Sequence, residues 1–130
     1  EAWQLSNAPV LAMAAHRAAL DLFDQTSMDE LRKKSLQLTA ALEGVLREIS
    51  EKYQTGWRLL TPADPKARGC QLSLFIPSGG KALFDHISSK GVVADWRNPN
   101  VIRMAPVPMY NSFSDIYRLQ QIILDFYEQS

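Results

Sequence analysis

Apolar residues recur at helical spacing in several stretches of the chain and alternate with polar residues in others. The first helical stretch, residues 10–24, is apolar on nearly every side, and Pro9 is well placed as a first helical residue. We expect such a helix to be covered all round, either as a central core helix or in part by a neighbour missing from this chain. The second runs from a capping box at residues 27–30 to near Lys52 and carries its apolar residues on one face. Its other face carries charged residues, Lys34 and Glu43 among them, so we expect an amphipathic surface helix with a structural role.

Strand-like alternation begins near the middle of the chain. Residues 53–68 contain glycine and prolines, which predicts a connection with at most a short strand around residues 57–60. Residues 70–76 then alternate apolar and polar side chains before Pro77, which predicts a half-buried strand. In that register Cys70 falls on the apolar face, where we expect a small core residue rather than a nucleophile.

The last third of the chain combines helical and strand-like patterns. A third helix is expected over residues 81–90, with Gly91 as its left-handed stop. Residues 92–105 read as a hairpin, with strands at residues 92–96 and 101–105. A capping box at residues 112–115 begins a last helix with one apolar stripe. Short strands separated by helices predict an α+β two-layer domain, with a small, largely antiparallel sheet covered by helices on one side. We expect residues 1–130 to form a single domain.

Length and charge narrow the functional classes. A chain of 130 residues with 46% apolar content suits one globular domain with a real core. Its 14 basic residues balance its 14 acidic ones, so we expect no nucleic acid and no membrane as a partner bound by bulk attraction. No apolar run approaches the roughly 20 residues of a membrane span. The chain starts at Glu1 without a methionine, and we expect it to be a fragment of a longer protein.

Candidate metal ligands and nucleophiles are few. The chain has one cysteine, Cys70, which excludes an intrachain disulfide and suits a reducing, cytoplasmic compartment. His16 lies in the apolar first helix, where a core histidine is expected, and Asp85 and His86 lie on what reads as a surface helix. None of these residues is at a metal-ligand spacing from another, so we expect no metal site.

One arginine stands out. Arg103 lies in a strand-like run between Ile102 and Met104; if those two face the helices, Arg103 points from the opposite face of the sheet. A guanidinium keeps its charge and requires an anionic partner when it is taken out of water. From the residues alone, that partner is either a neighbouring carboxylate, Asp95 or Asp115, or the carboxylate of a bound small molecule.

Three segments together resemble the C-terminal part of kynureninase. They are Trp-Gln-Leu-Ser-Asn-Ala-Pro at residues 3–9, Arg-Gly-Cys-Gln-Leu at residues 68–72, and the long run at residues 97–113, Arg-Asn-Pro-Asn-Val-Ile-Arg-Met-Ala-Pro-Val-Pro-Met-Tyr-Asn-Ser-Phe. The resemblance covers essentially the whole chain. It implies the C-terminal small domain of a pyridoxal 5'-phosphate enzyme of the aspartate aminotransferase fold type, with the helix at residues 10–24 linking it to a large N-terminal domain.

The resemblance also implies an activity and site residues. Kynureninases hydrolyse L-kynurenine or 3-hydroxykynurenine to an anthranilate and L-alanine in tryptophan catabolism and NAD biosynthesis, as homodimers. In that family the arginine matching Arg103 binds the substrate α-carboxylate, and the asparagine matching Asn7 lies near the substrate. Where relatives often carry proline, this chain has Ala8. None of its six lysines stands in the context of the Schiff-base lysine, so we expect the fragment alone to be inactive.

Two other functions stay open at this point. One is the small domain of another enzyme of the same fold type, a desulfurase or an aminotransferase, which keeps the carboxylate arginine for a different amino acid. The other is a stand-alone module that binds a small carboxylate and regulates a partner.

Overall fold

The computed structural model of the chain describes residues 6–129. The chain divides into two compact units, with the boundary between Leu31 and Arg32. That the two units form one domain over residues 1–130 stays a prediction. The elements follow in the order α1 (Val10–Phe23), α2 (Met28–Tyr53), β1 (Arg58–Leu59), the 3-10 helix η1 (Pro65–Ala67), β2 (Leu72–Phe75), α3 (Gly80–Ser89), β3 (Asp95–Arg97), β4 (Val101–Met104) and α4 (Phe113–Glu128).

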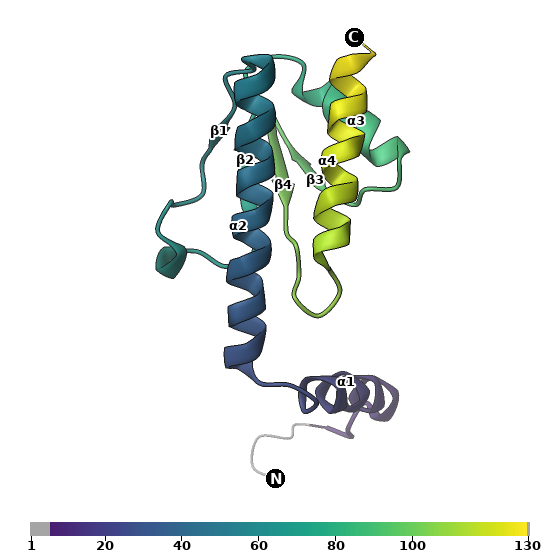
Figure 1. Ribbon diagram of the computed structural model, residues 1–130. Helices are drawn as coiled ribbons and strands as arrows, with labels where there is room; N and C mark the ends of the chain where they lie inside the picture. Colours follow the sequence, from purple (N-terminus) through teal and green to yellow (C-terminus); the bar gives the residue numbers. More distant parts are fainter. Residues whose placement is uncertain (1–5, 130) are drawn as a thin grey trace. The chain divides into compact units, whose positions relative to one another are not determined.

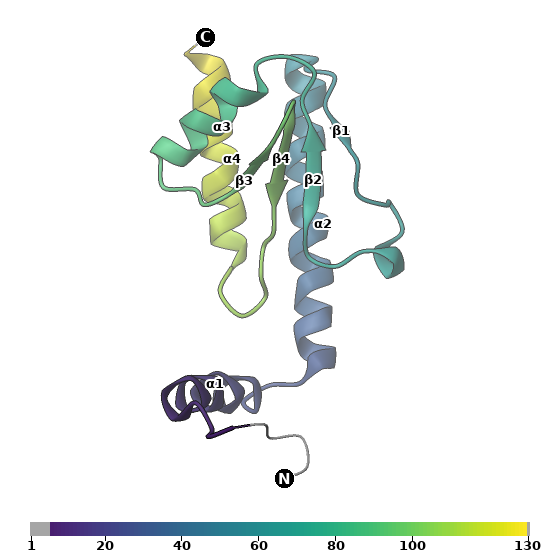
Figure 2. The ribbon, with the colours of Figure 1, turned by 180° about the vertical axis from the view of Figure 1, so that it is seen from behind.

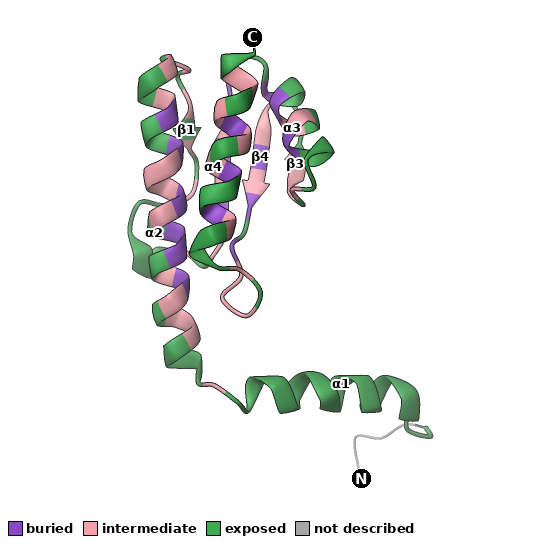
Figure 3. Cartoon of the chain, turned by 45° about the vertical axis from the view of Figure 1, so that its right-hand side comes forward, coloured by how far each residue is buried: buried purple, intermediate pink, exposed green. Residues whose placement is uncertain are grey.

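Helix α1 makes up most of the first unit. It confirms the helix expected at residues 10–24, although Pro9 precedes the helix instead of being its first residue. Every residue of α1 is exposed, as the uniform colour of this helix in Figure 3 shows. Large apolar side chains such as Leu11 and Phe23 are therefore uncovered within this unit.

Helix α2 begins at the expected cap and is continuous over its 26 residues. The Ser27 hydroxyl accepts a hydrogen bond from the Glu30 N–H at 3.2 Å, which satisfies one of the free donors at the start of the helix. Glu30 in turn accepts from the Thr26 hydroxyl at 3.1 Å. The buried face of the helix consists of Ser35, Leu38, Thr39, Leu42, Leu46 and Ile49.

The second unit contains a four-stranded antiparallel sheet in the order β1-β2-β4-β3. Helices α2 and α4 lie in front of the sheet in Figure 1, and α3 lies beside β3, as the view from behind in Figure 2 also shows. The aromatic ring of Phe84 on α3 packs against that of Trp96 on β3, with ring centroids 5.9 Å apart. This arrangement confirms the α+β class and the largely antiparallel sheet covered by helices on one side.

The core lies between the helices and one face of the sheet (Figure 3). Side chains of a strand alternate between its two faces, so every second residue of β2 and β4 points into this core. The buried apolar residues are Leu38, Leu42, Leu46, Ile49, Leu72, Leu74, Ile76, Leu83, Ile87, Ile102, Met104, Ile116, Leu119 and Ile123.

Several predicted boundaries shift by a few residues. The strand expected at residues 70–76 is Leu72–Phe75, and the first strand of the hairpin is Asp95–Arg97 rather than residues 92–96. The hairpin is confirmed by the antiparallel pairing of β3 with β4. Gly91 follows α3 with φ +86°, which confirms it as the left-handed stop of that helix.

Candidate functional site

The candidate site lies on the face of the sheet opposite the helices. In β4, Ile102 and Met104 are buried in the core, and Arg103 between them lies on the other face. The cross-strand partners of Arg103 are Ser73 on β2 and Asp95 on β3. By this alternation the open face carries Arg58, Ser73, Phe75, Asp95, Arg97, Val101 and Arg103.

Arg103 forms an ion pair with Asp95. Its Nε donates a hydrogen bond to Asp95 Oδ2 at 2.5 Å, and its Nη2 contacts the same oxygen. Arg97 Nε donates to this oxygen as well, at 2.8 Å. The side chains of Arg103, Asp95 and Arg97 are 33%, 46% and 59% exposed. Two guanidinium groups thus share one carboxylate, which leaves a net positive charge on an open surface.

The two arginines keep Asp95 ionised. Desolvation acts to raise the pKa of Asp95, but hydrogen bonds from Arg103 and Arg97 and their positive charges outweigh it, so the pKa lies below its usual value. The carboxylate therefore stays charged at neutral pH, and its contacts with both arginines persist there.

Asp115, the other carboxylate considered for Arg103, is used elsewhere. It caps α4, where its Oδ2 accepts from the Ser112 N–H at 2.8 Å and from the Ser112 hydroxyl at 3.1 Å. These bonds from the Ser112 backbone and side chain lower the pKa of Asp115. Within residues 6–129, Asp95 is thus the carboxylate that meets Arg103.

The segment that follows Arg103 is anchored at several points. The Val107 N–H donates to Asn111 Oδ1 at 2.9 Å, and the Val107 carbonyl accepts from the Asn111 N–H at 2.8 Å. Lys34 Nζ on α2 donates to the Pro108 carbonyl at 2.7 Å. The sequence pattern placed Lys34 on the solvated face of α2, and that interpretation is wrong because this ammonium group is half-buried against the loop.

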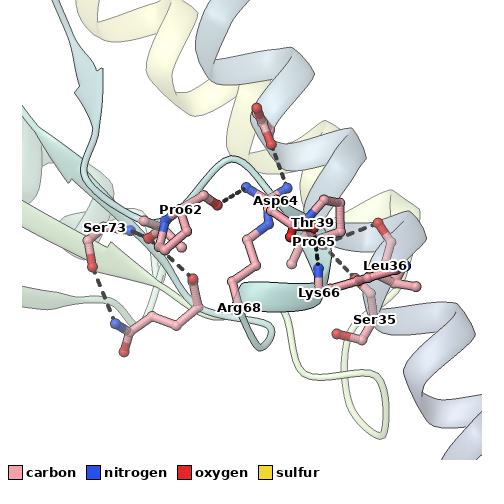
Figure 4. Close-up of polar contacts among 12 residues, drawn as sticks. Ser35, Leu36, Thr39, Pro62, Asp64, Pro65, Lys66, Arg68 and Ser73 are labelled. Carbon is pink, nitrogen blue, oxygen red and sulfur yellow. Dashed lines mark hydrogen bonds and ion pairs between the residues drawn. The ribbon is translucent and has the colours of Figure 1, made fainter.

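A second arginine fixes the loop before β2 (Figure 4). Arg68 is only 6% exposed, and its Nη2 lies 2.7 Å from Glu43 Oε2 on α2. Its Nη1 donates to the Pro62 carbonyl at 3.3 Å. The strand-opening segment at residues 68–72 thus owes its position to a half-buried ion pair that the sequence pattern did not reveal, because Glu43 reads as an ordinary surface residue.

Asn7 lies in the other unit from Arg103. It is exposed and precedes α1 in a bend. Asn7 belongs to the first unit, which ends at Leu31, and Arg103 belongs to the second. The role predicted for Asn7 beside a substrate therefore stays a prediction.

Other candidate residues differ from expectation. Cys70 is half-buried and lies just before β2 rather than within it. A ring nitrogen of His86 lies 3.1 Å from the Ile122 carbonyl, so His86 is packed against α4 rather than solvated, while Asp85 pairs with Lys81. His16 is exposed on α1, contrary to the expected core position.

Neither a metal centre nor a membrane span is found in the described part of the chain. Among residues 6–129, no three side chains of His, Cys, Asp or Glu gather in a way that could hold a metal ion. No helix of the described residues has the length and apolar character needed to cross a bilayer.

The lysines do not fit a cofactor attachment site at the open face. A Schiff-base lysine would have to reach this face, and none of the chain's six lysines lies on a strand. Lys34, Lys52 and Lys81 are held by contacts with the Pro108 carbonyl, Glu128 and Asp85, respectively. The open face therefore fits an anion facing Arg103, but not the lysine that would bind pyridoxal 5'-phosphate.

Comparisons with known proteins agree on one family. A family model described as the kynureninase C-terminal domain matches residues 31–123. Kynureninase from Christiangramia forsetii is 48% identical over 123 residues, covering 95% of this chain and 29% of that protein. Kynureninase from Xanthomonas campestris pv. campestris is 53% identical over 122 residues, covering 92% of this chain and 28% of that protein.

A further relative and a solved structure also match the chain. Kynureninase from Flavobacterium psychrophilum is 44% identical over 95% of this chain. A solved structure titled NifS-like protein matches 78% of this chain with a TM-score of 0.64 and 18% identity, covering 29% of that protein; this likeness shows the fold alone. The chain spans less than a third of the length of the curated relatives it matches.

Proposed function

The chain belongs to the kynureninase C-terminal domain family, and from this premise we propose that it is the C-terminal domain of a longer, pyridoxal 5'-phosphate-dependent kynureninase. That enzyme hydrolyses L-kynurenine or 3-hydroxykynurenine to an anthranilate and L-alanine. It works in the cytoplasm as a homodimer, with a large N-terminal domain that supplies the cofactor lysine. The cofactor, when bound there, supplies the electron sink for the carbon chemistry.

In this proposal Arg103 binds the α-carboxylate of the substrate. The observation that carries it is the place of Arg103 on the open face of the sheet, with one third of its side chain exposed. Among the described residues its carboxylate partner is the half-exposed Asp95. A planar guanidinium can hold a carboxylate through two parallel hydrogen bonds and so fix its orientation, which the point charge of a lysine does not do. Arg103 thus contributes binding and orientation, and the groups that move protons lie outside this chain.

The kynureninase assignment is favoured over the other members of the fold type. Identities of 44–53% over more than nine tenths of the chain connect it to proteins named kynureninase. The NifS-like structure shares the fold at 18% identity, which carries no argument for its chemistry.

The test is the Arg103→Ala variant of the full-length enzyme. We expect kcat/KM for L-kynurenine to fall by the equivalent of about 2 to 5 kcal/mol, the usual scale for removing one partner of a charged pair. Cofactor loading, followed by its visible absorbance, should not change. As a further readout, the wild type should prefer kynurenine strongly over its α-carboxamide, and the variant should lose that preference because no carboxylate partner remains.

Arg58→Ala is the matched control. Arg58 lies on the same open face but on β1. Its guanidinium carbon lies over the ring of Phe75, 4.8 Å from the ring centroid. We expect this variant to keep kcat/KM within about twofold, as is typical of a surface site away from the substrate. The isolated 130-residue chain should turn over no kynurenine and serves as the blank. Unchanged kcat/KM in Arg103→Ala would refute the role proposed for Arg103.

A further inference from the structure

We propose that Asp95 is a positioning residue for Arg103. It orients the guanidinium so that the end-on edge, formed by the two terminal nitrogens Nη1 and Nη2, is free to bind the substrate carboxylate. This inference rests on the proposed function of Arg103 and goes beyond it. It assigns a role to a residue that the sequence pattern offered only as a rival partner for the arginine.

The atoms in contact support this role. A guanidinium offers five N–H donors in a fixed planar fork. Asp95 Oδ2 meets Nε and Nη2 of Arg103, which together form the side edge of the fork. The end-on edge, formed by Nη1 and the second hydrogen of Nη2, is therefore left for another carboxylate. Asp95 and a substrate carboxylate use different donors of the same group and do not compete.

The sheet and Arg97 hold Asp95 itself in place. Asp95 lies directly across from Arg103 in the antiparallel pairing of β3 with β4, so the two side chains leave the same face of the sheet side by side. Arg97 donates to the same Oδ2 at 2.8 Å. A carboxylate that accepts hydrogen bonds from two guanidinium groups keeps a defined position, although it is half exposed to water.

Positioning and competition predict opposite results when Asp95 is removed. If Asp95 occupied the donors that the substrate needs, its removal would strengthen substrate binding. If Asp95 holds Arg103 in the binding orientation, its removal frees a long side chain that must then be ordered at each binding event. Ordering one such side chain weakens binding by about 2- to 12-fold.

The experiment uses the full-length enzyme with Asp95→Ala and Asp95→Asn. We expect KM for L-kynurenine to rise about tenfold in the alanine variant and about threefold in the asparagine variant, whose amide oxygen still accepts from Arg103. The value of kcat should change less than KM. Asp85→Ala is the matched control, because Asp85 is also an exposed aspartate in an ion pair, with Lys81 on α3, and it should leave KM unchanged.

A double-mutant cycle with Arg103→Gln separates this inference from the proposed function. If Asp95 acts through Arg103, then Asp95→Ala adds no further rise in KM once Arg103 is replaced, whereas a general structural role would add its effect in both backgrounds. An unchanged or lowered KM in the Asp95 variants, or an additive cycle, overturns the inference while Arg103→Gln alone stays impaired. If Arg103→Gln alone leaves KM unchanged, the proposed function fails and the inference fails with it.

Discussion

The ion pair between Arg68 and Glu43 should contribute strongly to stability, and Glu43→Gln tests this. Arg68 is 6% exposed and Glu43 is 26% exposed, with 2.7 Å between Nη2 and Oε2. Arg68 Nε is buried without a hydrogen-bond partner among the described residues. Glu43 is therefore the main compensation for a guanidinium that has already lost much of its contact with water.

The expected magnitude follows from this burial. Removing one partner of a fully buried pair costs about 3–5 kcal/mol because the other charge is left uncompensated. Two features of the structure reduce that figure. Water reaches the partly exposed Glu43, and the glutamine oxygen can still accept a hydrogen bond from Arg68. We therefore expect Glu43→Gln to lower the free energy of unfolding by about 1–3 kcal/mol.

Urea unfolding of the 130-residue chain at neutral pH measures this change. Glu51→Gln is the matched control, since it removes the same charge from an exposed position on the same helix, and it should stay within about 0.5 kcal/mol of the wild type. The double variant Glu43→Leu, Arg68→Met should be more stable than either single variant, because it leaves no buried charge. If Glu43→Gln were indistinguishable from Glu51→Gln, the reasoning from burial would be refuted.

Three further substitutions test α2 and the caps of α3 and α4. Gly44→Ala should raise the free energy of unfolding by about 0.8–1 kcal/mol, because a Cβ at this helical position meets no atom within 4 Å. Gly79→Ala should lower the free energy of unfolding by about 1–2 kcal/mol, because the φ of +72° at this position is strained for a residue with a Cβ. Urea unfolding of both variants checks that the two changes have opposite signs. The pKa of Asp115 is lowered from 3.8 by the hydrogen bonds from Ser112, so its stabilising effect is full above that pH and is lost as the pH falls through the lowered pKa. Thermal unfolding across pH should therefore show Asp115→Asn less stable than the wild type at pH 7, with the gap closing in acid; a gap that does not change with pH would contradict this assignment.

The elements of the fold could be predicted from local patterns. Two capping boxes and apolar residues at helical spacing were enough to place α2 and α4, and alternation was enough to place Arg103 on the face opposite Ile102 and Met104. These features depend on residues close together in the sequence. The strand ends were less accurate, because the pairing partners decide where a short strand begins and stops.

The contacts that build the site could not be predicted in the same way. Glu43 and Lys34 read as solvated residues of an amphipathic helix, yet they bind Arg68 and the Pro108 carbonyl across 25 and 74 positions of the chain. No periodicity marks such long-range partners. The choice of Asp95 over Asp115 as the carboxylate beside Arg103 likewise depended on the strand register, which only the folded chain reveals. The capping box at residues 112–115, by contrast, could be predicted from the sequence.

Strand register explains how an arginine on an open face can keep a defined position. Ile102 and Met104, on either side of Arg103, are buried in the core and hold β4 there. The pairings with Ser73 and Asp95 fix the position of Arg103 along the strands. A slip of β4 by one residue would exchange its two faces, bury the guanidinium among the helices and expose two core side chains. Such a slip is strongly disfavoured, since a buried unpaired charge and two lost apolar contacts would both oppose it. The same apolar residues that stabilise the fold therefore also determine where a bound carboxylate would meet the protein.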